Sequence, residues 1–196
     1  MTRPSPFDEV LVWCRENAPV VAASLRDGAR PDDIDELDRT LGYRLDPTAR
    51  EFFETFNGEA DYMIGEHDTS PLLPIGYLFS LDKIVAVRKE LGLSHHGTAL
   101  GTAGEEAEEF SDGFLPIAGI DSDYLYIDMR PGLRRGCIGY WNGEDFETSG
   151  ALWPDLATMF SDLLAALRTG GPIMNRRIVI EPSGAIEWVH TYWDEA

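Results

Sequence analysis

The hydrophobic pattern of this chain changes its period partway along the sequence. Up to about residue 91, apolar residues recur three or four positions apart, which is the spacing of helices that bury one face. From Phe114 onward, the apolar runs are short, rich in β-branched and aromatic residues, and separated by turn residues, as is typical of strands. Helices followed by consecutive strands predict an α+β fold with a mainly antiparallel sheet flanked by helices.

Prolines, polar caps and glycines mark the ends of the expected helices. We expect the first four helices over residues 6–17, 31–41, 46–56 and 80–91. Pro19 should end or kink the first one. The helix with the clearest start and stop signals lies between Asp46-Pro47 and Asn57-Gly58. It contains several phenylalanines that we expect in the core. A further amphipathic helix after Pro154, closed by Gly170-Gly171, should cover the sheet.

Strands are expected at three places in the second half, over residues 114–118, 124–128 and 138–141. The third meets Asn142-Gly143, whose residues both accept positive φ and therefore favour a tight hairpin. A terminal hairpin is expected over residues 177–190, turning at Pro182-Ser183-Gly184. Between these elements, we expect residues 59–74 to form an irregular connection with room for a short strand at 62–64, and residues 94–112 to form a flexible loop.

Size and composition predict one folded domain. A chain of 196 residues is long enough for one domain with a sizeable core. With 43% apolar and 11% aromatic residues, it has ample material for that core. The two cysteines, Cys14 and Cys137, are expected to be buried and unpaired, as is usual in a reducing compartment.

The net charge of the chain limits the classes of partner that it can bind. The chain has 35 acidic and 16 basic residues, which gives a formal net charge of -19. Such a charge repels phosphate backbones and anionic lipid, so we expect neither nucleic acid nor a membrane as partner, and a basic protein is the natural one. No apolar stretch has the length of a membrane span, and the first residues carry no basic segment followed by an apolar one. We therefore expect a cytoplasmic protein, whose oligomeric state the sequence leaves open.

Signatures of catalysis are missing. The sequence has no Gly-x-Ser-x-Gly nucleophile motif and none of the glycine-rich loops that bind nucleotides. The metal-ligand candidates are His95-His96, Glu66-His67-Asp68, and the acids Asp121, Asp123 and Asp128. Adjacent histidines point in different directions, and the acids lack the spacing of a calcium loop. We expect no enzyme activity, no cofactor and no metal; a hydrolase or metal enzyme built in the loop over residues 59–68 is a weaker alternative.

Acidic residues concentrate in two stretches without any Lys or Arg. Seven acids lie between Arg50 and Lys83, and nine lie between Lys89 and Arg130. They either keep the surface soluble or form an acidic face that steers a basic partner. Aromatic residues beside polar turns would then anchor the partner, unless they belong to the core. The candidate partner-binding residues are Glu59, Asp61, Tyr62, Asp121, Asp123, Tyr124 and Trp141.

Several short motifs occur in a particular order along the chain. They are Ile34 with Leu37, Leu41-Gly42, Leu45-Asp46-Pro47, Phe52-Phe53, Asn57-Gly58, Phe114-Leu115-Pro116-Ile117, Asp121–Asp128 and Phe160–Leu167. In this order the chain resembles the SUKH superfamily, whose founding branch is the Smi/Knr-like group of cell-wall-assembly regulators. Proline stands one place later than in the family pattern, and Glu59 stands where a second glycine is common. The resemblance covers about residues 30–168.

The resemblance implies a single SUKH-like α+β domain over residues 1–196. Its core would span about residues 30–168, with an N-terminal helix at 6–17 and a C-terminal hairpin extension at 177–190. Many bacterial members of the superfamily are thought to be immunity proteins that neutralise toxins, and others are regulators that hold partners. Together with the charge, the resemblance implies a non-enzymatic protein that occludes a basic toxin, such as a nuclease. The alternative is a regulator or scaffold in a cell-wall or stress pathway.

Overall fold

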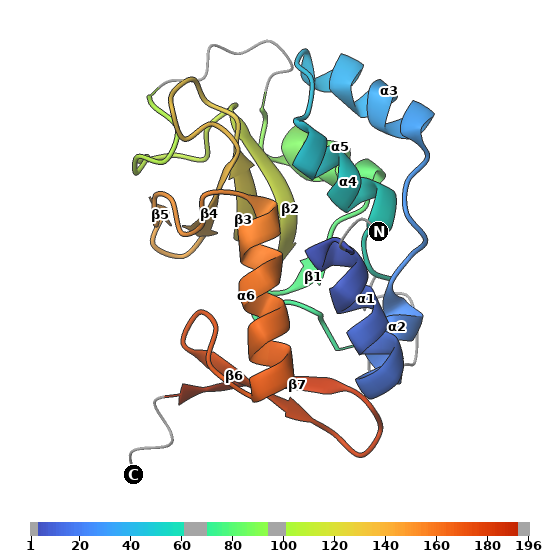
Figure 1. Cartoon of the computed structure of the whole chain (residues 1–196). Helices are drawn as coiled ribbons and strands as arrows, with labels where there is room; N and C mark the ends of the chain where they lie inside the picture. Colours follow the sequence, from blue (N-terminus) through green and yellow to red (C-terminus); the bar gives the residue numbers. More distant parts are fainter. Residues whose placement is uncertain (1–3, 61–69, 94–100, 192–196) are drawn as a thin grey trace.

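A five-stranded antiparallel sheet with strand order β1-β2-β3-β4-β5 organises the chain. The computed structural model describes residues 4–60, 70–93 and 101–191 (Figure 1). Its helices are α1 (Pro6–Asn17), α2 (Pro19–Ser24), α3 (Pro31–Leu41), α4 (Pro47–Thr55), α5 (Leu81–Glu90) and α6 (Leu156–Thr169). The sheet contains β1 (Tyr77–Leu78), β2 (Phe114–Ile120), β3 (Asp123–Asp128), β4 (Cys137–Asn142) and β5 (Glu147–Thr148), and a separate pair contains β6 (Arg176–Ile180) and β7 (Ile186–His190). The predicted α+β fold with a mainly antiparallel sheet is confirmed.

Local capping explains where the helices begin and end. The side chains of Ser5, Asp46, Ser80 and Asp155 accept hydrogen bonds from backbone N–H groups in the first turns of α1, α4, α5 and α6. Gly42 ends α3 at φ 76° in the left-handed region, which costs glycine little. Pro19 does not simply end the first helix, because its fixed φ also suits a first helical turn and it begins the short helix α2.

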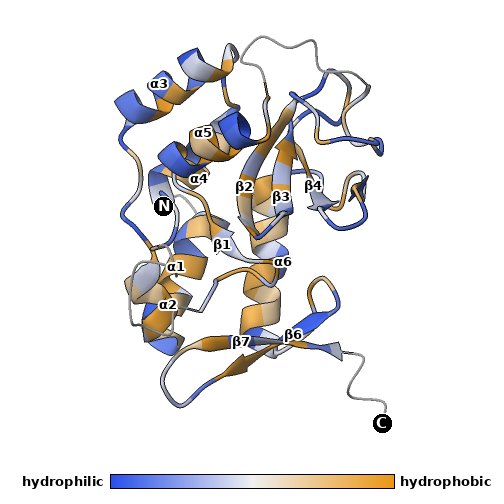
Figure 2. Ribbon diagram, turned by 180° about the vertical axis from the view of Figure 1, so that it is seen from behind, coloured by the Kyte–Doolittle hydropathy of each residue, from blue (hydrophilic) through white to orange (hydrophobic). Residues whose placement is uncertain are grey.

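The helices meet around a cluster of phenylalanines. The centroids of three rings, those of Phe7 on α1, Phe52 on α4 and Phe160 on α6, lie 5.1–5.7 Å apart. The rings meet edge to face, which is a favourable geometry for aromatic pairs. Figure 1 shows α6 crossing one face of the sheet, and Figure 2 shows that it is hydrophobic along most of its length, whereas α3 is mostly hydrophilic. The expectation that the helix after Pro154 covers the sheet is confirmed.

The turn after β4 differs from the expected tight hairpin. Neither Asn142 nor Gly143 has positive φ; the left-handed residue of this turn is Phe146, at φ 56°. The side-chain oxygen of Asn142 accepts hydrogen bonds from the N–H groups of Glu144 and Asp145, which stabilises a wider turn before β5. Gly143 passes so close to Ser122 that a Cβ would lie 2.3 Å from its Oγ. Close packing, not positive φ, therefore requires glycine at this position.

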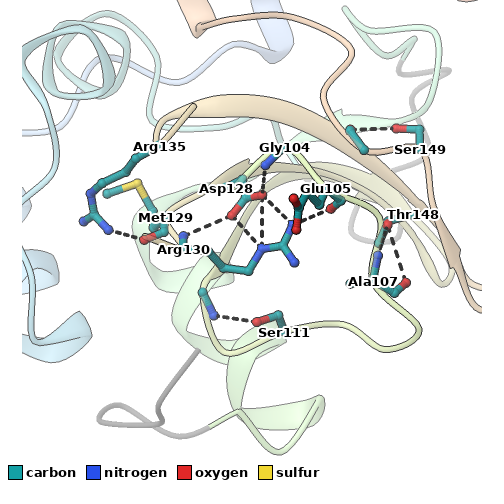
Figure 3. Close-up of polar contacts among 12 residues, drawn as sticks. Gly104, Glu105, Ala107, Ser111, Asp128, Met129, Arg130, Arg135, Thr148 and Ser149 are labelled. Carbon is teal, nitrogen blue, oxygen red and sulfur yellow. Dashed lines mark hydrogen bonds and ion pairs between the residues drawn. The ribbon is translucent and has the colours of Figure 1, made fainter. Parts of the chain in front are cut away.

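A buried ion pair at the end of β3 fixes the irregular segment over residues 101–112. Asp128 and Arg130 are each 1% exposed, and the Arg130 Nη2 lies 2.8 Å from the Asp128 Oδ2 (Figure 3). Asp128 also accepts a hydrogen bond from the N–H of Gly104, and Arg130 donates to the carbonyl oxygen of Glu105. Further along, the N–H of Ala107 donates to the Oγ1 of Thr148. The part of the expected flexible loop that the structure describes therefore follows a defined path.

The expected C-terminal hairpin forms, and it packs on the body. The hydroxyl of Ser70 bonds to both the N–H and the carbonyl of Ile186, and the indole N–H of Trp188 donates to the carbonyl of Pro71. Both cysteines, Cys14 and Cys137, are buried and unpaired. In the described part of the chain, no helix is long and apolar enough to cross a membrane.

We expect the variant Asp128→Ala to lose about 3–5 kcal/mol of unfolding free energy, because it leaves the buried Arg130 charge without its partner. Urea unfolding measures this change. The control is Asp33→Ala, which breaks the solvent-exposed pair with Arg30 and should change stability far less. Equal effects of the two substitutions would contradict this account of the ion pair.

Candidate functional site

A groove between α5 and the β2–β3 turn brings together three of the seven predicted partner-binding residues. Glu59, Asp121 and Tyr124 all line this groove, which has a volume of about 290 Å³ and which we call the α5 groove. Residues that the sequence did not single out complete it: Arg26, Tyr77, Leu78, Phe79, Ser80, Lys83, Val87, Glu90, Gly119 and Ile120.

The α5 groove is lined by apolar side chains and by charges of both signs. Lys83, Val87 and Glu90 are spaced by four and three residues, so they share one face of α5. Among the lining residues, the rings of Phe79 and Tyr124 meet edge to face at 6.1 Å. Arg26 joins Lys83 as a second cation, and the groove also contains the carboxylates of Glu90 and Asp121. Such a groove suits a protein segment that carries both charges around apolar side chains.

The carboxylate of Glu59 is buried, so it does not belong to an exposed acidic face. Glu59 is 5% exposed and accepts hydrogen bonds from the N–H groups of Leu72 at 3.0 Å and Leu78 at 2.7 Å. Burial raises the pKa of this carboxyl to about 7, while those two N–H donors and the hydroxyl of Ser24 act in the opposite direction. Glu59 therefore satisfies backbone donors that converge on it from distant parts of the chain.

The Asn57-Gly58 motif fastens the end of α4 to the start of α5. The Oδ1 of Asn57 accepts a hydrogen bond from the N–H of Leu81 at 3.1 Å. Gly58 has φ 83°, and a Cβ there would lie 2.4 Å from the backbone nitrogen of Ser80. The close approach of the segment after α4 to the segment before α5 therefore requires asparagine at position 57 and glycine at position 58. The next residue, Glu59, lines the α5 groove.

The other predicted residues have different environments. Tyr124 and Trp141 are 9% and 5% exposed, so they belong to the core, which is the alternative that the sequence left open. Asp123 is half-buried and accepts hydrogen bonds from the Tyr140 hydroxyl and the Gly143 N–H. Asp121 is exposed at the turn after β2. Asp61 and Tyr62 lie outside the described residues.

Exposed acids differ in whether an arginine balances them. On α3, Asp33 pairs with Arg30, Glu36 with Arg39, and Asp35 with Arg50, which also pairs with the buried Asp38. Within the segment over residues 105–112, four exposed acids form no ion pair with any residue that the structure describes: Glu105, Glu106, Glu108 and Glu109. Part of the net negative charge of the protein is therefore concentrated in these four glutamates, which belong to the stretch without Lys or Arg between Lys89 and Arg130.

Metal-ligand clusters are not formed by the part of the chain that the structure describes. Across residues 4–60, 70–93 and 101–191, no group of three or more His, Cys, Asp or Glu side chains could hold a metal ion. The expected weak candidates at His67 and at His95-His96 lie outside these ranges.

Comparison with protein families identifies the fold. The chain matches the model of the SMI1 / KNR4 family (SUKH-1) over residues 28–162. Because this match covers more than half of the chain, the protein belongs to the SUKH-1 family. A search of curated proteins finds no significant match. Helices α1 and α2 and the hairpin β6–β7 lie outside the matched range.

We expect the buried Glu59 to make stability depend on pH. Its pKa is raised from 4.5 to about 7, so between these values the native protein holds a proton that the unfolded chain has released. The unfolding free energy should therefore fall as pH rises through this window, because the native state binds more protons there. Urea unfolding across the pH range should show a shallower fall for Glu59→Gln than for the unmodified protein.

The control for this measurement is Glu90→Gln, which removes an exposed acid from the same groove. It should keep the slope of the unmodified protein. If Glu59→Gln also keeps that slope, the raised pKa of Glu59 is refuted.

Proposed function

We propose that this SUKH-1 protein is a non-enzymatic protein-binding domain that acts in the cytoplasm as an immunity protein. It neutralises a basic toxin, such as a nuclease, by covering the toxin's cationic surface. The observation that carries the proposal is the group of exposed acids over residues 105–109, which form no ion pair with a described residue and lie in a segment bonded to the sheet. The net charge of -19 and the family membership support it.

Electrostatics explains how such a protein inhibits without chemistry. A nuclease attracts nucleic acid with lysines and arginines that neutralise phosphates. Carboxylates held at fixed positions compete for the same cations, and the field of a protein with charge -19 speeds the encounter. Inhibition by occlusion needs only a surface that complements the toxin, so no catalytic residue is required of the immunity protein.

A regulator or scaffold in a cell-wall or stress pathway is the second candidate function. The mixed charge of the α5 groove favours it, because Arg26 and Lys83 beside Glu90 and Asp121 suit a partner that is not strongly basic. Genetic context separates the two functions. A neighbouring gene for a large secreted toxin supports the immunity role, and isolation from any such gene supports the regulator.

Co-expression with the toxin encoded beside this gene tests the immunity role. We expect the chain to restore growth and to form a complex that weakens as salt rises, since exposed charges are screened beyond about 8 Å at physiological ionic strength. Growth and pull-down at low and high salt are the two measurements. Failure to restore growth, together with no complex at low salt, contradicts the proposal.

A further inference from the structure

A second groove lies between the C-terminal end of α5 and the acidic segment. Its volume is about 760 Å³, and we call it the acid-rimmed groove. Glu106, Glu108 and Glu109 line it together with the apolar side chains of Leu91 and Phe110. Leu91 is 37% exposed although it is apolar, and Phe110 is only half-buried. The groove therefore combines negative charge with accessible hydrophobic surface.

The aromatic side of this groove is rigidly supported. The ring of Phe110 meets four other rings edge to face at 5.3–5.8 Å, those of Phe114, Tyr124, Tyr126 and Trp141. Because this packing and the Ala107–Thr148 hydrogen bond fix the segment in advance, a partner loses little free energy in ordering it.

The groove also contains a hydrogen-bond donor that no described residue engages. Arg130 lines the groove, and its Nε and Nη2 are bonded to Asp128 and to the carbonyl of Glu105 (Figure 3). Its Nη1 has no hydrogen-bond partner among the described residues. Since Arg130 lines the groove, this donor can bond to an acceptor that a bound ligand supplies, such as a main-chain carbonyl. Since Asp128 already balances the guanidinium charge, Arg130 does not repel a cationic ligand.

These features complement one kind of partner. Carboxylates on the rim attract lysine or arginine, Leu91 and Phe110 offer apolar contact, and Arg130 offers a donor to a peptide carbonyl. We propose that the acid-rimmed groove binds a basic, amphipathic segment of a partner protein. This inference rests on the proposed function and assigns its contact surface to residues 91–93 and 106–112, which do not line the α5 groove.

Synthetic peptides test the chemistry of the groove directly. The probe is a fluorescein-labelled peptide of about 15 residues, with Lys and Leu arranged so that a helix has one apolar face. A matched peptide carries Ser in place of Leu. Fluorescence anisotropy at about 50 mM salt should show binding of the Lys/Leu peptide about tenfold tighter than that of the Lys/Ser peptide.

Two charge-matched variants locate the binding. Glu108→Gln/Glu109→Gln removes two carboxylates from the rim, and Glu181→Gln/Glu187→Gln removes two exposed carboxylates from the C-terminal hairpin. We expect the rim variant to weaken binding of the Lys/Leu peptide about tenfold and the hairpin variant less than about twofold. Leu91→Ser should also weaken binding. Equal losses in the two double variants, or equal binding of the two peptides, overturn the inference.

The toxin co-expression assay separates failure of this inference from failure of the proposed function. If the unmodified chain restores growth and the rim variant restores it equally well, the acid-rimmed groove is not the contact surface, although the immunity role stands. If the unmodified chain does not restore growth, the immunity role and the inference built on it both fail. If the unmodified chain restores growth and the rim variant does not, the result supports both the immunity role and the inference.

Discussion

The buried pair of Asp128 and Arg130 is the interaction on which the arrangement of the acidic surface depends. Two charges removed from water are favourable only when hydrogen bonds satisfy their remaining atoms. Here Asp128 also bonds to Gly104 and Arg130 to Glu105, so the pair joins the end of β3 to a segment with no regular structure. A segment rich in repelling carboxylates is thereby held against the sheet, and its charges occupy defined positions.

The helices could be predicted because their boundaries are set by neighbouring residues. Caps such as Asp46, and the glycine at position 42, act within one turn of the backbone. The turn after β4 could not be predicted, because the decisive contact joins Gly143 to Ser122, twenty-one positions earlier. The same limit applies to the two-residue strands β1 and β5, which exist only through pairing with their neighbours.

The candidate site was predicted in part. Charge counting along the sequence identified the stretch that contains Glu108 and Glu109, but counting does not distinguish exposed acids from buried ones. Glu59 is buried because the N–H groups of Leu72 and Leu78 meet its carboxylate, a convergence visible only in three dimensions. A signal for Arg130 was present: an Asp at the end of an apolar strand, with an Arg two positions later that is the first base after Lys89.

Amide hydrogen exchange of the protein alone tests most directly whether the acidic segment is held in place. The N–H groups of Gly104 and Ala107 donate to Asp128 and Thr148, so the account predicts that they exchange with protection comparable to that of β2 and β3. Exchange of these two amides at the rate of an unstructured peptide, while β2 and β3 remain protected, would contradict it.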